Sequence, residues 1–275
     1  MNDPYVHLDL EQAAEAAFNK QAPLFDQIYA GNTIVHYKRE RVRSHVLGFL
    51  QPASEILELN AGTGEDAIFF AGLQHHVHAT DISEMMQERL REKVAGSGLQ
   101  HFVSTEKRSF TDLAGLENRG PYDLVFSNFA GLNCTGQLDR VLDSLAPLVK
   151  PGGLVTLVLL PKFCLWEFLL LFRGKFRTAF RRFAGKKGAS AHIEGEYFRC
   201  WYYNPRFVRR QLKADFRVVG LEGLCSFVPP SYIEQFAEKR PRWFGWLKSC
   251  EEKWKSSWPW RSIGDYYLIT LQKNS

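Results

Sequence analysis

The sequence predicts an α/β fold in which a mostly parallel sheet carries helices on both faces. Apolar, strand-like runs alternate with helix-like segments between Glu55 and Leu160. Strands that alternate with helices pair in parallel through right-handed crossovers. A glycine-rich turn follows the first of these strands, and an acidic residue ends the second. Both features predict a ligand site at the carboxyl ends of the strands.

The order of the elements follows from periodicity and from turn residues. Helices are expected at about 10–30 and 37–50, and Pro52 ends the second of them. Ser83 is an N-cap candidate for a later helix. Strands are expected at 55–60, 77–81, 102–104, 122–127, 154–160, 196–203, 216–228 and 266–272, and further helices at about 65–73, from Ser83, at 138–148 and at 205–213.

Composition limits the class of protein. The chain has 275 residues and a formal charge of +5, which suits one large α/β domain. Its five cysteines are scattered and form no CxxC pair, so neither a disulfide framework nor a metal site is expected. No secretory signal is expected, and Glu167 interrupts the longest apolar run, 163–172. We expect a cytoplasmic protein.

A short segment from Glu58 to Ala67 (ELNAGTGEDA) carries the strongest functional signal. It follows a predicted strand and opens a predicted helix. Gly62 and Gly64 lack a Cβ atom, so the backbone can turn sharply and a ligand can lie against it. Asp81 ends the next strand, where a carboxylate can accept two hydrogen bonds from a ribose diol.

Two classes of nucleotide cofactor fit this arrangement. Residues 62–67 formally match the G-x-G-x-x-A pattern of NAD enzymes. Glu58, however, suits the cationic amino-acid end of S-adenosylmethionine (SAM) and would repel a pyrophosphate. Glu65 and Asp66 stand at the helix start, where a dinucleotide would place that pyrophosphate. SAM is therefore favoured, and an NAD-dependent oxidoreductase remains the alternative.

Together with the turn at Pro151 to Gly153, these features make residues 56–160 resemble the class I SAM-dependent methyltransferase superfamily. The style is that of small-molecule enzymes of ubiquinone and biotin biosynthesis. The resemblance implies a Rossmann-like sheet of seven strands and transfer of a methyl group from SAM, leaving S-adenosylhomocysteine. It also implies a small, hydrophobic or aromatic acceptor, with O-methylation favoured. A non-catalytic SAM-binding protein is a further alternative.

The family pattern divides the single domain into four parts. They are a helical cap (1–50), a SAM-binding core (51–160), acceptor-binding insertions with the sixth strand (161–262) and the last strand (263–275). Two residues depart from the pattern. Asn60 replaces the first glycine of the motif, and Asn tolerates a left-handed backbone. Ser109 stands where many members have an acid facing the adenine amine.

The resemblance also implies site residues. We expect the cofactor to contact Tyr29, Tyr37, Arg39, Glu58, Asn60, Ala61, Gly62, Gly64, Asp66, Asp81, Ile82, Met86, Ser109, Phe110, Asn128 and Phe129. The acceptor is expected to contact Asn133, Trp166, Tyr202 and Tyr203. His192 is the candidate general base for a hydroxyl acceptor, and a surface histidine in a loop is the alternative interpretation.

Residues 162–187 combine eight Lys or Arg with one acidic residue, and phenylalanines lie between them. This pattern is typical of an amphipathic lid that contacts an anionic membrane or a lipid-like substrate. The alternative is a helical insertion with a basic outer face. The segment lacks a single-strand-binding signature, and the chain lacks an Asn-Pro-Pro-Tyr-type motif, so no nucleic-acid partner is expected.

Overall fold

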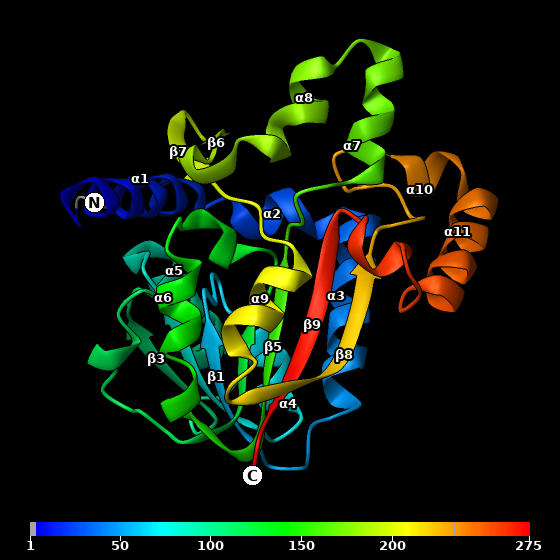
Figure 1. The fold of residues 1–275 in the computed structure, drawn as a ribbon. Helices are drawn as coiled ribbons and strands as arrows, with labels where there is room; N and C mark the ends of the chain where they lie inside the picture. Colours follow the sequence, from blue (N-terminus) through cyan, green and yellow to red (C-terminus); the bar gives the residue numbers. More distant parts are fainter. Residues whose placement is uncertain (1–3, 234) are drawn as a thin grey trace.

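A computed structural model describes residues 4–233 and 235–275. Its centre is a seven-stranded sheet with the order β3-β2-β1-β4-β5-β9-β8 (Figure 1). Only β9 runs antiparallel, between β5 and β8. This arrangement confirms the predicted fold class. The strands are β1 (Glu55–Leu59), β2 (His76–Asp81), β3 (Val103–Lys107), β4 (Tyr122–Ser127), β5 (Val149–Leu159), β8 (Phe216–Leu224) and β9 (Tyr266–Lys273).

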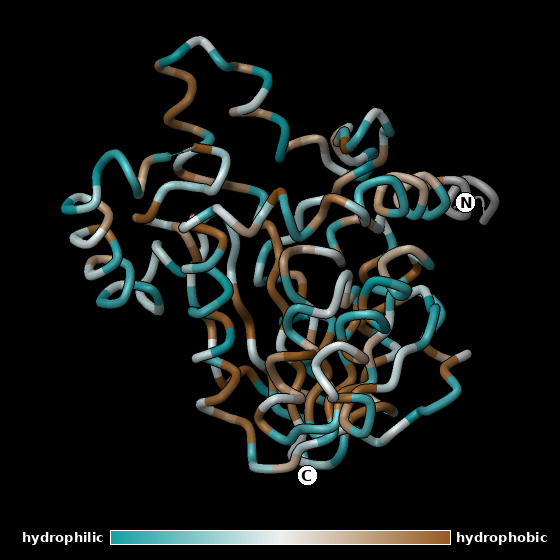
Figure 2. Tube along the Cα trace, turned by 180° about the vertical axis from the view of Figure 1, so that it is seen from behind, coloured by the Kyte–Doolittle hydropathy of each residue, from teal (hydrophilic) through white to brown (hydrophobic). Residues whose placement is uncertain are grey.

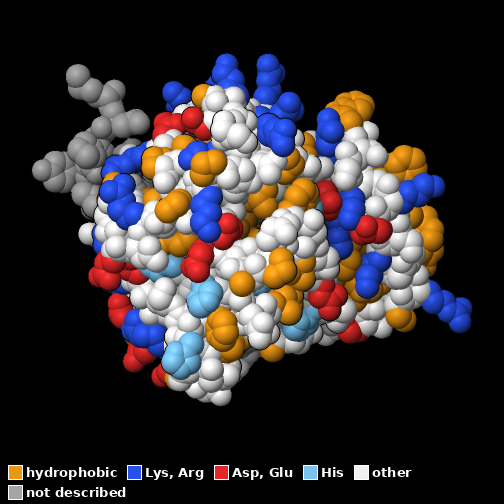
Figure 3. Space-filling model, turned by 90° about the horizontal axis from the view of Figure 1, so that it is seen from below, with side chains coloured by type: hydrophobic (Ala, Val, Ile, Leu, Met, Phe, Trp, Pro, Cys, Tyr) orange, Lys and Arg blue, Asp and Glu red, His pale blue; other side chains and the backbone are white. Residues whose placement is uncertain are grey.

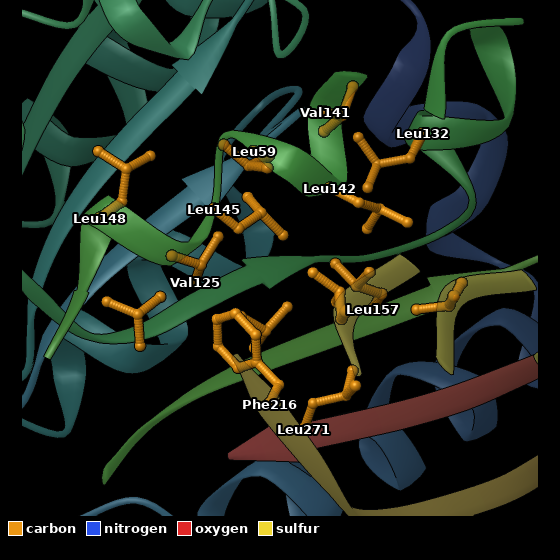
Figure 4. Packing of buried hydrophobic residues seen from close by; sticks show 14 of the residues in the cluster. Leu59, Val125, Leu132, Val141, Leu142, Leu145, Leu148, Leu157, Phe216 and Leu271 are labelled. Atoms are coloured by element: carbon orange, nitrogen blue, oxygen red, sulfur yellow. The ribbon is translucent and has the colours of Figure 1, made fainter. Parts of the chain in front are cut away.

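Helices cover both faces of the sheet because alternate side chains of each strand point to opposite faces. Ile56 packs with α3 (Thr33–Leu47), α4 (Glu65–Gly72) and α5 (Glu84–Gly96). Leu57 belongs to the other face, with α6 (Leu138–Asp143) and α9 (Pro205–Leu212). Figure 4 shows this second layer, where Leu59, Val125 and Leu157 of the sheet meet helical leucines. In Figure 2 the central strands are the most hydrophobic part of the trace.

The N-terminal cap consists of α1 (Pro4–Gln21), α2 (Phe25–Ala30) and α3. The single helix predicted at 10–30 is therefore two helices, and Pro23 lies in the turn between them. Helix α3 begins four residues earlier than predicted. The reason is Asn32, whose side chain accepts hydrogen bonds from the backbone N–H groups of Ile34 and Val35 at 3.1 Å each.

After β5 the chain leaves the sheet and forms a projection at the top of Figure 1. It contains α7 (Leu165–Leu169) and α8 (Phe176–Phe180). A hairpin of β6 (Ala189–Ile193) and β7 (Glu196–Cys200) follows, where the sequence predicted a loop around His192. Its two-residue turn has positive φ at Glu194 and Gly195, as tight hairpins require.

The remaining elements are short or lie at one end of the sheet. Strand β8 stops four residues before the predicted end, because Cys225 adopts a left-handed conformation (φ 57°). No helix in the ranges 4–233 and 235–275 has the length and hydrophobicity to cross a membrane. The other helices are α10 (Phe236–Lys239), α11 (Pro241–Trp254) and the 3-10 turns η1 (Leu113–Gly115), η2 (Gly131–Cys134), η3 (Ala146–Leu148), η4 (Leu170–Arg173), η5 (Arg181–Phe183), η6 (Gly185–Lys187) and η7 (Trp260–Ser262).

Candidate active site

A cavity of about 370 Å³ lies over the carboxyl ends of β1, β2, β4 and β5. The loops that follow these strands form its floor. Helices α1, α2 and α3, the β6–β7 hairpin, Ser231 and Tyr266 contribute the rest of the wall, on the upper side of the sheet in Figure 1. Parallel α/β sheets bind ligands at this edge. The cavity is therefore the candidate site.

The loop after β1 has the backbone that a close ligand approach requires. Asn60 takes a left-handed conformation (φ 51°), as its side-chain type allows. Its Nδ2 donates to the Asn128 carbonyl at 3.0 Å and its Oδ1 accepts from the Ser127 hydroxyl at 2.6 Å. The replacement of glycine thus gives a side chain that joins the loops after β1 and β4.

The two glycines of this loop have different roles. Both have positive φ, 56° at Gly62 and 80° at Gly64. A Cβ on Gly62 would meet no atom within 4 Å, so the backbone here is open to a ligand. A Cβ on Gly64 would lie 2.5 Å from the Leu90 side chain. Gly64 therefore serves the packing of α4 against α5 and does not line the cavity.

Asp81 is positioned at the end of β2 by two backbone hydrogen bonds. One carboxylate oxygen accepts from the Gly62 N–H and the other from the Ser83 N–H, both at 2.9 Å. Each oxygen keeps a lone pair for a further donor. Burial raises the pKa of this carboxyl, while those N–H groups act in the opposite direction. The geometry suits a ligand with two neighbouring hydroxyl groups.

Three buried polar atoms on the cavity wall lack a hydrogen-bond partner in the part of the chain that the structure describes. They are Gln21 Oε1, Arg39 Nε and Glu58 Oε2. Burial raises the pKa of Glu58 well above its usual value, and the nearby Asp66 carboxylate raises it further. An unsatisfied buried carboxylate and an unsatisfied guanidinium N–H each cost free energy unless a ligand meets them. A zwitterionic ligand matches both.

Asp66 faces the cavity but is already bonded on both oxygens. Oδ1 accepts from Arg43 Nε at 2.7 Å, and Oδ2 accepts from Asn128 Nδ2 at 2.8 Å. Asp66 therefore fixes the side chain of Asn128 next to Phe129, whose backbone is left-handed (φ 48°). The hydrogen bond between Asp66 and Asn128 therefore stabilises the turn after β4.

Sequence reasoning missed an acid that the cap brings to the cavity. Glu11 of α1 accepts hydrogen bonds from the hydroxyls of Ser109, at 2.9 Å, and Thr111, at 2.6 Å. Glu11 lines the cavity, whereas Ser109 does not. A carboxylate is thus present where the family pattern expects one, although it comes from a helix about a hundred residues away. Only the partner hydroxyls at 109 and 111 signal it in the sequence.

The cap is attached to the floor of the cavity at two other points. Asp26 of α2 accepts from the Thr63 hydroxyl at 2.6 Å and contacts Lys93 at 3.1 Å. Asn19 of α1 accepts from the Ser83 hydroxyl at 2.6 Å. These contacts hold α1 and α2 over the cavity.

The cavity wall also includes one buried amine. Lys38 of α3 is 2% exposed and lines the cavity. Its Nζ donates to the Ser231 hydroxyl at 3.1 Å and lies 3.9 Å from Asp265. The rings of Phe129 and Tyr266 flank it at 5.6 and 4.6 Å. The sequence analysis did not single out Lys38, because nothing in the local pattern shows that this helix face is buried.

Other residues of the cavity wall have apolar or neutral side chains. They are Phe18, Phe25, Tyr29, Cys134, Phe198 and Cys200. Burial raises the pKa of the Cys134 thiol far above its usual value and that of Cys200 to about 11. Both thiols are therefore neutral near pH 7 and act as apolar wall.

Thirteen of the sixteen residues predicted to contact the cofactor line this one cavity, and Tyr37, Gly64 and Ser109 do not. The Tyr37 ring packs on Phe244 at 6.0 Å, and its hydroxyl accepts from Arg41 at 3.1 Å. Tyr37 points away from the cavity because α3 turns that face toward α11.

The structure does not place the five residues predicted for the acceptor and for catalysis on the cavity wall. His192 is exposed on β6, while its neighbours Ala191 and Ile193 line the cavity, because side chains alternate along a strand. The histidine therefore faces away from the site. Its ring instead lies 4.6 Å from that of Tyr197.

The other four also lie away from the cavity wall, and three of them make internal contacts. Asn133 is fully buried and accepts from the Leu160 N–H at 3.0 Å. Tyr202 packs under the Arg182 guanidinium at 5.4 Å, and Tyr203 donates to the Thr135 carbonyl at 2.6 Å. Trp166 lies on α7. The cavity wall is formed by the strand-end loops and the cap, and these four residues do not contribute to it.

Comparison with known proteins agrees with this geometry. Residues 56–153 match the family described as "Methyltransferase domain". The glycine/sarcosine/dimethylglycine N-methyltransferase of Actinopolyspora halophila is 33% identical over 107 residues, 38% of this chain and 18% of that protein. The demethylmenaquinone methyltransferase of Bacteroides fragilis is 30% identical over 146 residues, 52% of this chain and 58% of that protein. The chain thus spans less than two thirds of the length of these relatives.

The fold extends beyond the matched segment. A Burkholderia thailandensis 1,6-didemethyltoxoflavin-N1-methyltransferase, solved with its substrate and S-adenosylhomocysteine, superposes with a TM-score of 0.58 at 14% identity. The match covers 100% of this chain and 92% of that one, so the similarity of overall fold is not confined to residues 56–153. The match over residues 56–153 confirms the predicted resemblance to class I SAM-dependent methyltransferases.

Proposed function

We propose that the protein transfers a methyl group from SAM to a small apolar acceptor, with an oxygen atom as the receiving group. One observation carries the proposal. A carboxylate oxygen of Glu58 and the Nε–H of Arg39 face the same cavity without a hydrogen bond, and the nearest carboxylate to Arg39 Nε, that of Asp66, is 3.8 Å away. They are complementary to the ammonium and carboxylate groups of the methionine end of SAM.

The other floor residues account for the rest of the cofactor. Asp81 would accept hydrogen bonds from the ribose hydroxyls through the lone pairs that Gly62 and Ser83 leave free. Ile82, Met86 and Phe110 offer apolar surface for the adenine. Bound SAM supplies an electrophilic methyl group on a sulfonium.

The adenine amine would meet Glu11. The hydroxyls of Ser109 and Thr111 orient this carboxylate beside the adenine wall. Because Glu11 belongs to α1, recognition of the base would couple cofactor binding to placement of the cap.

The apolar side chains of the cavity wall support an aromatic or other hydrophobic acceptor. Lys38 is the one described cation there without a contact shorter than 3.9 Å to a carboxylate, and it would hold an acceptor oxygen. A positive charge beside a hydroxyl favours its ionised form, which is the better nucleophile. Positioning of the acceptor opposite the sulfur supplies much of the rate. The chain then needs no histidine base.

Calorimetry with SAM, S-adenosylhomocysteine and NAD tests the cofactor. We expect SAM and its product to bind and NAD to be rejected, because Glu58 and Asp66 would repel a pyrophosphate. Tight NAD binding without SAM binding would overturn the proposal.

Transfer from methyl-labelled SAM to a panel of hydroxylated aromatics, quinols and amines then tests the reaction. Transfer to hydroxyl acceptors supports the proposal, and SAM binding without product on the whole panel favours a non-catalytic SAM-binding protein. Lys38→Met should raise the KM for the acceptor while the Kd for SAM changes little. Lys213→Met, at an exposed lysine directly after α9 that does not line the cavity, is the matched control.

A further inference from the structure

The projection formed by residues 162–187 accounts for the net positive charge of the molecule. The chain has 35 basic and 30 acidic residues. With the 8 basic and 1 acidic residue of this segment set aside, 27 basic and 29 acidic residues remain. The positive balance is therefore local to one surface element, which is the condition for a specific electrostatic partner.

The single acid of the projection is used internally. Glu167 accepts hydrogen bonds from Arg181 and Arg182, and Arg182 also bonds Asp265 at 2.8 Å. These buried pairs fasten the base of the projection to the start of β9. The nearby Cys164 completes a cluster of ligand-type side chains, but the guanidinium of Arg182 already bridges its two carboxylates.

Six cations of the projection have no acidic partner within the described parts of the chain. All six are exposed: Lys162, Arg173, Lys175, Arg177, Lys186 and Lys187. Elsewhere on the surface, several cations form ion pairs. Examples are Arg89 with Glu92 and Arg91 with Glu84. The projection therefore presents a positive surface that nothing in the described fold neutralises.

Large apolar side chains stand exposed among these cations. Phe172 is 84% exposed and Phe176 is 63% exposed, and Phe180 and Phe183 are each more than half exposed. Figure 2 shows hydrophobic and hydrophilic residues following one another along this part of the trace. Exposed phenylalanines in such a group are costly in water unless they meet an apolar partner.

The opposite end of the molecule differs in character. Figure 3, the view from below, shows acidic and basic side chains interspersed on that face. The projection stands on the other side, at the carboxyl ends of the strands, where the cavity lies (Figure 1).

We propose that the α7–α8 projection docks the protein on an anionic lipid bilayer. Its lysines and arginines would meet acidic headgroups, and its phenylalanines would enter the boundary between headgroups and acyl chains. Charge complementarity favours an anionic surface, and the four exposed phenylalanines among the cations supply the apolar contact that a lipid layer offers. A nucleic acid, whose bases stack on aromatic rings, is the rival partner that the experiment below separates. This docking goes beyond the proposed methyl transfer and does not depend on it.

Co-sedimentation of the full chain with vesicles tests the inference. One set contains phosphatidylcholine alone, and the other contains about one third phosphatidylglycerol. At about 0.15 M salt we expect binding to the anionic vesicles to exceed binding to the neutral ones at least about 100-fold, because each cation near the surface contributes on the order of 1 kcal/mol. Absence of binding to anionic vesicles, or equal binding to both, would overturn the proposal.

Variants identify the surface responsible. Lys175→Glu with Arg177→Glu should lower binding to anionic vesicles at least about tenfold. Arg209→Glu with Arg210→Glu, the same charge change on exposed positions of α9, should leave it within about twofold. Phe172→Ser with Phe176→Ser should also lower binding about tenfold.

A single-stranded RNA oligonucleotide distinguishes the rival partner. If the chain binds it more tightly than anionic vesicles, and Lys175→Glu with Arg177→Glu abolishes that binding, the surface is a nucleic-acid site and the lipid proposal is wrong. SAM binding, measured by calorimetry on each variant, should not change. Loss of vesicle binding with intact SAM binding therefore separates this inference from the proposed function.

Discussion

The floor of the cavity and its cap are formed by different kinds of structural element. The floor comes from short loops directly after β1, β2 and β4, where position in the sheet fixes position in the site. The cap comes from α1, α2, α3 and the β6–β7 hairpin, which reach the same cavity from distant parts of the sequence. The residues of the floor can therefore be predicted from the sequence. In the cap, the structure identifies further cavity-wall residues, such as Glu11 and Lys38.

The two regions also differ in how their charges are satisfied. On the floor, Glu58 keeps an unpartnered oxygen beside the cavity. At the base of the projection, the carboxylates of Glu167 and Asp265 both accept hydrogen bonds from Arg182. A cavity-wall carboxylate oxygen without a hydrogen bond indicates a ligand, whereas buried ion pairs away from the cavity indicate a structural role. The following predictions separate the two regions.

The largest effect is expected from the buried ion pairs of Arg182. Arg182→Met should lower the free energy of unfolding by at least about 3 kcal/mol, because it removes the nearest cation of buried Asp265 and one of the two guanidinium partners of buried Glu167. Urea denaturation measures the change. Arg173→Met, at an exposed position of the same projection, is the control and should change stability little. Equal effects of the two would contradict the structural role of Arg182.

Asp81→Ala should weaken SAM binding about 100-fold, since two hydrogen bonds to a charged acceptor are worth about 3 kcal/mol together. Calorimetry gives the Kd. The substitution also frees the N–H groups of Gly62 and Ser83, so a thermal unfolding curve must show that the variant is folded. An unchanged Kd in a folded variant would remove Asp81 from the site.

The affinity for SAM should rise with pH because of Glu58. Burial raises the pKa of this carboxyl in the free protein, so its ionisation extends to higher pH than that of an ordinary glutamate. A bound ammonium group favours the ionised form and lowers that pKa. Binding therefore releases a proton, and the Kd should fall as pH rises toward the free-site pKa.

Glu58→Gln is the corresponding test. It should weaken binding about tenfold at alkaline pH and remove this part of the pH dependence. A variant with the same slope as the parent chain would assign the titration to another group.

Glu11 tests whether the cap reads the base. Glu11→Ala should weaken binding of S-adenosylhomocysteine several-fold and abolish its preference over the deaminated inosyl analogue. Glu15→Gln is the matched control, because Glu15 of the same helix contacts Lys107 at 2.8 Å and does not line the cavity. If Glu11→Ala kept the preference for adenine, Glu11 would only support the fold.

The smallest effect is expected at His192. His192→Ala should leave methyl transfer and its pH profile unchanged, since the imidazole is exposed on the outer side of β6. Initial rates between about pH 6 and 9 check this. A lost basic limb would return His192 to the mechanism.

The sequence by itself determined the parts of this protein that depend on neighbours along the chain. The strands, the glycine turn and the acid after β2 lie in fixed order, and parallel pairing brings the strand ends to one edge. Asn60 could be interpreted for the same reason, because its backbone conformation is a local property. Residues 58–66, 81–86 and 128–129 were therefore predictable as a group.

Only the tertiary structure decided which side chains of the cap and insertions face the cavity. A helix or strand shows its buried face only when its partner is known, which is why Lys38 was missed and Tyr37 and His192 were misplaced. The pairing of Glu11 with Ser109 and of Glu167 with Arg182 joins residues that no local pattern connects. Contacts between distant segments depend on packing, and periodicity within one segment does not encode them.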